Sequence, residues 1–402
     1  MDTRTLHRTI FLLSLATFSS MAIQRICDPM LPELSRQFDQ PLALVSQVVS
    51  LYAVAHGLMQ FFWGPLGDRL GKFRLVVWCL LGCSLGSFLC AISPQLQWLV
   101  LARMLTALFS AALVPLSLAW IGDQVPYDVR QATLARLGLG TMLGIAGGQL
   151  LGGVLSDTLG WRWAFGVMAC FFLAVCVLLW IQKVQEAPAH AQAAGMTGFI
   201  QRIAQVLASP WARILLGMAL LEGAAVLGVL AVTAAHLHQA HQISLSAAGG
   251  TSALYGLGGM LYMATARHLI ARLGELNLGR MGALLIGMAF LVVGLSPDWR
   301  WAMPACFAAG FGFGMLHSTL QVKATQMVPE ARATCVTLFA GAMFAGQSIG
   351  VLALSEAMTV LPSSTVISLG ACLSLALAAV FTHAMRRHDP SLRAGSKGHP
   401  VS

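Results

Sequence analysis

The sequence predicts an all-α membrane protein whose twelve transmembrane helices form two pseudo-symmetric six-helix bundles. Three observations indicate this fold class. The composition is strongly apolar, with 57% hydrophobic residues, 10% charged residues and a mean hydropathy of +0.76, whereas a soluble domain has about 25% charged residues. Long uncharged apolar runs recur along the chain. Finally, two segments of the first half recur in the second half at one common spacing.

Each apolar run is interpreted as one membrane-crossing helix. Lipid offers no hydrogen-bond partners to an exposed backbone, and a helix needs about 20 mostly apolar residues to span a bilayer. The runs lie at residues 9–30, 43–64, 74–93, 97–121, 131–155, 163–182, 212–236, 246–266, 277–295, 300–322, 333–359 and 363–384. The first run follows a short basic segment without a convincing cleavage site, so we expect a retained helix and not a removed signal peptide.

The runs and the segments between them divide the chain into four regions. These are an N-terminal six-helix bundle at 1–182, a cytoplasmic linker at 183–211, a C-terminal six-helix bundle at 212–385 and a cytoplasmic tail at 386–402.

The two bundles repeat each other weakly. Arg69-Leu70-Gly71 recurs as Arg272-Leu273-Gly274, and the proline of "QVPYDVRQAT" recurs in "MVPEARAT", both at a shift of 203 residues. Two independent matches at one offset indicate parallel repeats related by an axis along the membrane normal.

The net charge of +9 is distributed by topology. With the N-terminus inside, the cytoplasmic positions receive Arg4, Arg8, Arg69, Lys72, Arg74, Arg130, Lys183, Arg202, Arg213, Arg267, Arg272, Arg280, Lys323, Arg332, Arg386, Arg387, Arg393 and Lys397. The outside receives only Arg36, Arg162 and Arg300. This positive-inside bias predicts cytoplasmic termini and explains the basic excess without nucleic acid. We expect a monomeric multi-pass protein of the plasma membrane, the inner membrane of a bacterium.

The cysteines and histidines do not predict a metal site. The nine cysteines lie mostly inside predicted spans and form no CxxC pair, so we interpret them as small apolar packing residues. The segment "HLHQAHQ", residues 236–242, brings three histidines to a predicted outside loop without an accompanying carboxylate or cysteine.

A charged loop, "GPLGDRLGKFR" at residues 64–74, interrupts two apolar runs. Its charged residues are Asp68, Arg69, Lys72 and Arg74, and its glycines are Gly64, Gly67 and Gly71. The glycines permit a tight turn and close backbone contact. A carboxylate beside a helix N-terminus gains about 0.3–2 kcal/mol, which suits a latch that breaks easily. Under the alternative interpretation, the basic residues only anchor the topology.

Charges inside the spans point to a polar interior, since each costs about 2.5–3.5 kcal/mol at the centre of a bilayer. Asp28 and Arg103 fall at similar depth in the outer half of the first bundle, and Arg25 lies nearly one turn before Asp28. Their depth suggests an Asp28–Arg103 ion pair that a proton would break. The alternative is a helix-end carboxylate among lipid headgroups.

Glu222 lies alone near the middle of the seventh span, where protonation is favoured over an isolated charge. We interpret it as a proton carrier or cation receptor; the alternative is a neutral glutamic acid hydrogen-bonded between helices. Two histidine–glutamine pairs at i, i+4, His317 with Gln321 and His56 with Gln60, each share one helical face. They either line a cavity or are packed polar residues.

These motifs resemble those of the major facilitator superfamily, in its twelve-helix drug:proton antiporter-like branch, over residues 9–385. The charged loop resembles that superfamily's signature between helices two and three, and Arg103 matches its fourth-helix arginine. "GIAGGQLLGGVL" is similar to the antiporter motif of helix five through Gly144, Gly148, Gly152 and Gly153. It departs at Gln149, where the motif carries proline, and at Ala135, where the motif begins with glycine. "GWRWAF" also resembles this branch.

The resemblance implies that Asp68 contacts the start of helix eleven when the protein opens outward. The glycine ladder of helix five, Gly140, Gly144, Gly148 and Gly152, would let that helix pack closely against a partner. Spacing alone leaves open whether the ladder serves coupling or only packing.

The functional expectation is a secondary transporter, a proton-coupled exporter of small organic molecules that needs no cofactor. "GCSLG" lies inside a span without the setting of a nucleophile elbow, "GDRLGK" has the wrong spacing for a phosphate loop, and HExxH is absent. The chain is therefore not expected to be an enzyme, and a proton gradient is its expected energy source. The alternative is a facilitator or proton symporter that imports a sugar or organic acid. A third interpretation, a sensor that transports nothing, is disfavoured because the sequence shows no soluble output domain.

Overall fold

The structure, a computed structural model, describes residues 3–182, 184 and 196–388, and the regular elements of these residues are all helices. The N-terminal half contains α1 (Thr3–Arg25), η1 (Asp28–Met30), α2 (Leu31–Phe38), α3 (Leu42–Val45), α4 (Gln47–Leu70), α5 (Lys72–Ala91), α6 (Leu96–Gln124), α7 (Tyr127–Thr158) and α8 (Trp161–Ile181). The C-terminal half contains α9 (Met196–Ala208), α10 (Pro210–Glu222), the π-helical η2 (Gly223–Gly228), α11 (Val229–His241), α12 (Leu245–Leu295), η3 (Trp299–Trp301), α13 (Ala302–Thr325), η4 (Pro329–Ala331), α14 (Arg332–Val360) and α15 (Ser363–His388).

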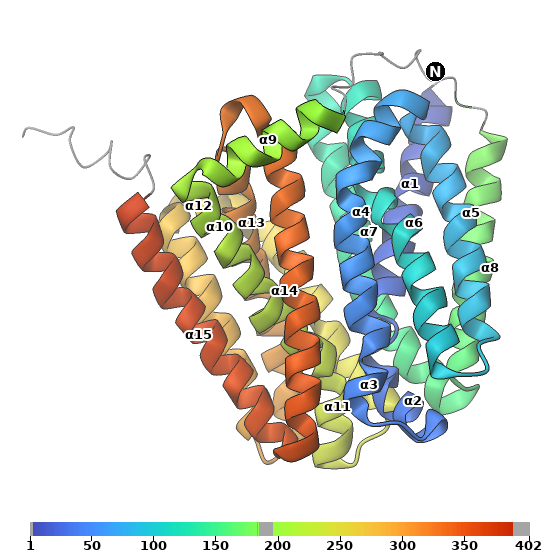
Figure 1. Cartoon of the computed structure of the whole chain (residues 1–402), viewed down its shortest axis with the longest axis vertical. Coiled ribbons are helices and arrows are strands. Elements are labelled where there is room, and N and C mark those ends of the chain that lie inside the picture. Colours follow the sequence, from blue (N-terminus) through green and yellow to red (C-terminus); the bar gives the residue numbers. More distant parts are fainter. Residues whose placement is uncertain (1–2, 183, 185–195, 389–402) are drawn as a thin grey trace, which may run out of the picture.

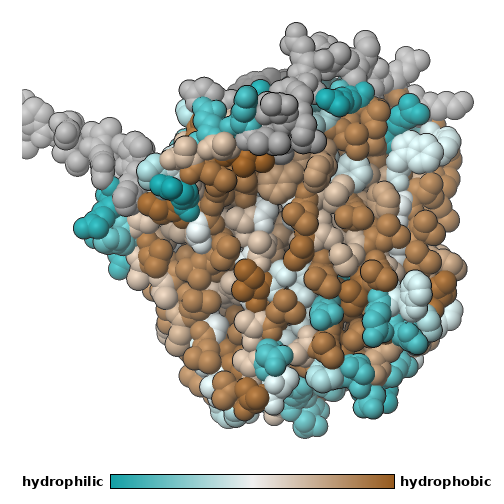
Figure 2. All heavy atoms as spheres, viewed as in Figure 1, coloured by the Kyte–Doolittle hydropathy of each residue, from teal (hydrophilic) through white to brown (hydrophobic). Residues whose placement is uncertain are grey.

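These helices make twelve crossings, six in each half, as the sequence predicts. Ten helical stretches of the described chain are long and apolar enough to span a membrane. One of them, α12, contains two crossings of 51 residues in all, separated by the non-helical backbone of Gly274 (φ 70°, ψ 165°). The less apolar α13 completes the set. On the face that Figure 2 shows, hydrophobic side chains cover a broad middle region and hydrophilic side chains gather toward the two ends, as expected for a protein in a bilayer.

Different helices lie at the two ends of the molecule (Figure 1). The N-terminus and α9 lie at one end, called here the N-terminal face; α2, α3 and the end of α11 lie at the other, called the opposite face. The two halves pack against each other mainly through α7 with α12 and α4 with α14. At the opposite face, α11 also packs on η1 and α2, and α14 on α3.

Three segments differ from the sequence-based expectation. The expected linker 183–211 contains the helix α9, which was not predicted; residues 183 and 185–195 lie outside the described residues, as do 389–402 of the expected tail. The first crossing extends through η1 into α2. The expected loop 236–242 was wrong, because α11 continues to His241. His236 is buried there, with its ring nitrogens bonded to Ser363 Oγ and Val293 O.

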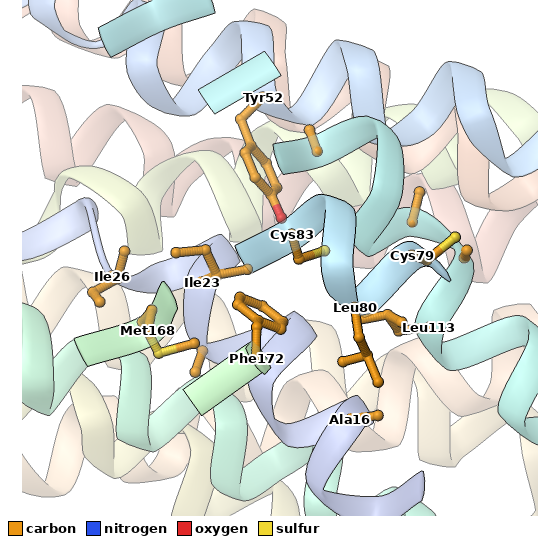
Figure 3. Packing of buried hydrophobic residues seen from close by; sticks show 14 of the residues in the cluster. Ala16, Ile23, Ile26, Tyr52, Cys79, Leu80, Cys83, Leu113, Met168 and Phe172 are labelled. Atoms are coloured by element: carbon orange, nitrogen blue, oxygen red, sulfur yellow. The ribbon is translucent and has the colours of Figure 1, made fainter. Parts of the chain in front are cut away.

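The core of the N-terminal half shows why cysteines are frequent. Cys79 and Cys83 lie among apolar side chains such as Leu80, Leu113 and Phe172 (Figure 3). All nine thiols are free, and seven of them are buried. Their position confirms the interpretation of cysteine as a small packing residue.

The glycine ladder of α7 packs directly on α1. A Cβ added at any of its members would meet a carbonyl oxygen of α1 or of the turn after it: Gly140 faces Ser14, Gly144 faces Phe18, Gly148 faces Ala22 and Gly152 faces Ile26. A spacing of four residues on both helices keeps the two backbones in contact over several turns. The partner of the ladder, which spacing could not identify, is therefore α1.

We expect Gly148→Ala to lower the stability of the folded protein. Its new methyl group must displace the Ala22 backbone, and overpacking of this kind costs about 1–3 kcal/mol of unfolding free energy. Gly166→Ala is the matched control, because nothing lies within 4 Å of a Cβ at Gly166. Thermal unfolding of both variants in detergent checks this; equal midpoints would contradict the packing assignment.

Candidate functional site

Asp28 lies in a fully buried polar cluster near the opposite face. It is the first residue of η1 and is 0% exposed. Its Oδ2 accepts a hydrogen bond from Gln149 Nε2 at 2.8 Å and pairs with Arg25 Nη1 at 3.5 Å. Arg25 precedes Asp28 by three residues, so its side chain reaches the carboxylate without crossing between helices. The predicted ion pair of Asp28 with Arg103 is therefore corrected to an ion pair with Arg25.

Arg103 instead binds backbone. Its Nη1 donates to Ile23 O at 2.7 Å and its Nε to Val48 O at 3.1 Å, and its guanidinium carbon lies 4.0 Å from the centre of the Tyr52 ring. Ile23 O belongs to the last turn of α1, where helix carbonyls have no intrahelical donor. Arg103 thus joins α6 to α1 and α4, and it stays within electrostatic range of Asp28.

A hydrogen-bonded network extends from Tyr52 toward the other half. Tyr52 Oη lies 2.6 Å from Ser110 Oγ, which also lies 3.3 Å from His56 Nδ1. His56 is buried, and its ring centre is 4.6 Å from that of Phe344 in α14. Gln60 Nε2 donates to Ala111 O at 3.4 Å. In this conformation His56 therefore belongs to the contact between the two halves and does not face an open space.

Gln149 is the functional candidate that sequence reasoning missed. It is fully buried on α7, and its side-chain oxygen has no hydrogen-bond partner among the protein groups that the structure describes. The signal was present, since Gln149 stands where the antiporter motif carries proline. Its meaning required the fold, because only the packing of α7 on α1 brings the amide to Asp28.

The C-terminal half contains a second buried carboxyl group. Glu222 is 0% exposed and ends α10, where the helix widens into the π-helical η2. Such wide turns are frequent at functional sites. Glu222 Oε2 lies 3.3 Å from His317 Nδ1, so this carboxyl and imidazole can share one proton. Glu222 Oε1 has no hydrogen-bond partner among the described protein groups.

Aromatic rings surround the Glu222–His317 pair. The His317 ring stacks on Phe313 at 4.9 Å between centres and lies 5.6 Å from Phe339. The His317 side chain is 21% exposed, although Glu222 beside it is fully enclosed. Gln321, one turn nearer the N-terminal face on the same side of α13, is exposed. Accessibility therefore increases from Glu222 along α13 toward the N-terminal face.

Tyr255 of α12 lies near a member of each carboxyl cluster. Its hydroxyl is buried, lacks a hydrogen-bond partner among the described groups, and lies within electrostatic range of both Arg25 and Glu222. The ring packs 5.6 Å from Phe313. Tyr255 thus interacts electrostatically with one member of each cluster.

The charged loop at residues 64–74 lies apart from these clusters, at the N-terminal face. Asp68 Oδ1 is 3.3 Å from Lys72 Nζ, which lies 2.5 Å from Asp123 Oδ2 at the end of α6. The Asp68 side chain is 55% exposed. Its ion pair is therefore made within the N-terminal half. Among the described residues, no three His, Cys, Asp or Glu side chains are grouped so as to hold a metal ion.

Comparison with known proteins agrees with this architecture. Residues 13–353 match the family described as the Major Facilitator Superfamily. The chain is 24% identical over 330 residues to the uncharacterized MFS-type transporter YceJ of Bacillus subtilis, covering 81% of this chain and 83% of that protein. It is 26% identical to the multidrug resistance protein B homolog of Mycobacterium tuberculosis, over 80% of this chain and 70% of that protein.

A shorter match is made to the multidrug export protein EmrB of Escherichia coli, 27% identical over 43% of this chain and 34% of that protein. Among solved structures, the nucleoside transporter NupG aligns with a TM-score of 0.80 at 13% identity, over 94% of this chain and 99% of that chain. A bacterial homolog of the human lysosomal transporter Spinster aligns over the full length of both chains, with a TM-score of 0.72 at 17% identity.

We expect Arg25 and Asp28 to be energetically coupled. Arg25→Gln or Asp28→Asn alone leaves one buried charge without its partner, whereas the double variant leaves none, so the double loss should be smaller than the sum by about 0.5–3 kcal/mol. Unfolding of the four proteins in detergent measures the coupling. The cycle of Asp28→Asn with Arg103→Gln should give a smaller value. Strictly additive Arg25 and Asp28 losses would contradict the assigned pair.

Proposed function

Because the chain belongs to the Major Facilitator Superfamily, we propose that this membrane transporter exports small organic molecules in exchange for protons. The proposed cycle alternates access to a site between the two six-helix halves. The protein would lie in the inner membrane of a bacterium as a monomer with cytoplasmic termini, so that the N-terminal face is the cytoplasmic face.

The observation that carries the proposal is the Glu222–His317 pair. An enclosed carboxyl group costs least free energy when it is neutral or paired. With one oxygen 3.3 Å from an imidazole and the other without a described partner, Glu222 has room to gain and lose a proton. His317 is partly accessible, so it is the proposed relay between Glu222 and the N-terminal face.

Asp28 and Arg25 are assigned the second role in the cycle. Tyr255 lies within electrostatic range of both Arg25 and Glu222, and Arg25 is paired with Asp28. Tyr255 is therefore the proposed connection between the carboxyl group of the C-terminal half and the ion pair of the N-terminal half. This is the proposed physical link between proton binding and movement of the halves.

The exchange direction rests on the relatives, two of which are named as multidrug proteins. The alternative remains a facilitator or a proton symporter that imports a sugar or organic acid. Export predicts that a strain producing the protein tolerates toxic compounds better than a strain lacking it. Import predicts improved growth on a limiting nutrient and no gain in tolerance. Growth across a panel of both kinds of compound decides between them.

Glu222→Gln should uncouple transport from the proton gradient. The amide resembles a carboxyl group that never loses its proton, so the variant should still exchange a transported compound across the membrane but should not concentrate it. One proton moving down 100 mV supplies about 2.3 kcal/mol, enough for a gradient of about 50-fold in a neutral solute. Accumulation by inverted vesicles with an imposed pH gradient measures the difference.

The matched control is Glu356→Gln, which neutralises an exposed carboxylate of α14 that lies away from the Glu222–His317 pair. It should accumulate the compound as the unaltered protein does. If Glu222→Gln vesicles reach the same pH-driven gradient, Glu222 is not the coupling group. If Glu222→Gln still accumulates the compound and Asp28→Asn does not, Asp28 is the proton-binding group.

Asp68→Asn should slow transport about tenfold while the protein still inserts and folds. Asp68 is the acid of the signature loop, and the interaction of its carboxylate with a helix N-terminus is worth up to about 2 kcal/mol. Asp298→Asn, which removes an exposed carboxylate near Arg300 at the other end of the molecule, is the control. If correctly folded Asp68→Asn transports at the normal rate, Asp68 does not act as a latch in the transport cycle.

A further inference from the structure

A carboxylate at the end of α7 joins the two halves at the opposite face. Asp157 Oδ2 accepts hydrogen bonds from Ser246 N and Ser246 Oγ, each at 2.6 Å, and Asp157 Oδ1 accepts one from Leu245 N at 3.3 Å. Leu245 and Ser246 form the first turn of α12, whose amides have no acceptor within the helix. A residue of the N-terminal half thus caps a helix of the C-terminal half.

The sequence around Asp157 repeats the charged loop within the same half. "GVLSDTLG" at 153–160 is identical to "GPLGDRLG" at 64–71 in five of eight positions, at a shift of 89 residues. Asp157 aligns with Asp68, and Gly160 aligns with Gly71. The two glycines also share a backbone conformation, with φ of 96° and 95°, that other residues rarely adopt.

The two copies point to opposite faces. The first copy ends α4 at the N-terminal face, and the second ends α7 at the opposite face, as expected for three-helix repeats of inverted topology within one half. The two helices also have corresponding partners across the molecule, since α4 packs on α14 and α7 packs on α12. The acid that ends each helix therefore lies at a different face of the molecule, where the two halves meet.

We propose that Asp157 is the latch that holds the opposite face closed, the counterpart of Asp68 at the N-terminal face. Only one latch is engaged here. Asp157 reaches across to α12, whereas Asp68 pairs with Lys72 of its own half. The contacts of α11 with η1 and of α14 with α3 close the same face as Asp157. Each face has its own acid, and release of one accompanies engagement of the other.

The chemistry of the latch suits repeated opening. Asp157 is exposed, so water can replace its three donors when the halves separate. Loss of a side-chain cap of this type changes a two-state ratio by about tenfold, which corresponds to about 1.4 kcal/mol. The latch stabilises one conformation measurably without preventing exchange.

Distances between spin labels test the proposal without a substrate. One label pair, at Gln40 and Gln239, spans the opposite face, and a second pair, at Gln131 and Arg272, spans the N-terminal face; all four positions are exposed. Exposed Cys170 and Cys372 are replaced by alanine in the background. Asp157→Ala should lengthen the first distance and shorten the second, shifting the ratio of the two states by about tenfold.

Ser246→Ala should cause a smaller shift in the same direction, because it removes one of the three hydrogen bonds. Glu33→Ala is the control, because Glu33 is paired with Arg36 of its own helix at the same face. Unchanged distances in Asp157→Ala would overturn the proposal, and so would lengthening across both faces, which would indicate general loosening.

Hydrogen exchange of the first turn of α12 provides a second readout. In Asp157→Ala, the amides of Leu245 and Ser246 should exchange faster, while that of Ala247, which is bonded to Ser244 Oγ, should not change. Equal exchange in both proteins would overturn the assigned contact. The inference assumes alternating access, but neither experiment uses protons or substrate, so a failure here is distinct from a failure of the Glu222 assignment.

Discussion

The close packing of α7 against two helices at once determines where the polar groups of this transporter meet. On one side its glycine ladder lies on the backbone of α1; on another, Gly153 lies against the backbone of Leu245 in α12. A residue with a side chain at these positions would separate the helices. Because the helices touch, Gln149 reaches Asp28 and Asp157 reaches the first turn of α12. One helix therefore both binds a buried acid and caps the other half.

The interior follows the rule that a charge removed from water must be paired or neutral. Among the described residues, no carboxylate lies at contact distance from Arg103. Its guanidinium group donates to two backbone carbonyls and lies over an aromatic ring, an arrangement that suits a permanent charge. Asp28 and Glu222 have different surroundings. Asp28 pairs with Arg25, and Glu222 lies 3.3 Å from His317, so each carboxyl group contacts an ionisable side chain. This difference separates the structural cation from the groups proposed to take part in transport.

Much of the fold follows from the sequence because its signals are local. A run of apolar residues identifies a crossing, lysines and arginines indicate its direction, and the shift of 203 residues groups the crossings into halves. The site follows less fully. Depth suggested Arg103 as the partner of Asp28, although Arg25 was closer along the same membrane crossing. The Glu222–His317 contact joins helices 95 residues apart, and no periodicity specifies that pairing. The amphipathic α9 and the helical end of α11 were missed because their histidines, glutamines and arginine resemble those of loops.

The π-helical segment after Glu222 has a consequence for motion. A π turn holds one residue more than an α turn, so it carries a surplus residue within an otherwise regular helix. If the π turn moves along the helix, each residue that it passes rotates by about 100° about the helix axis, while the ends of the helix remain in place. The seventh crossing, formed by α10, η2 and α11, can therefore adopt a second rotational position at Glu222. A rotation of this kind would turn Glu222 away from His317 without any bending of the bundle.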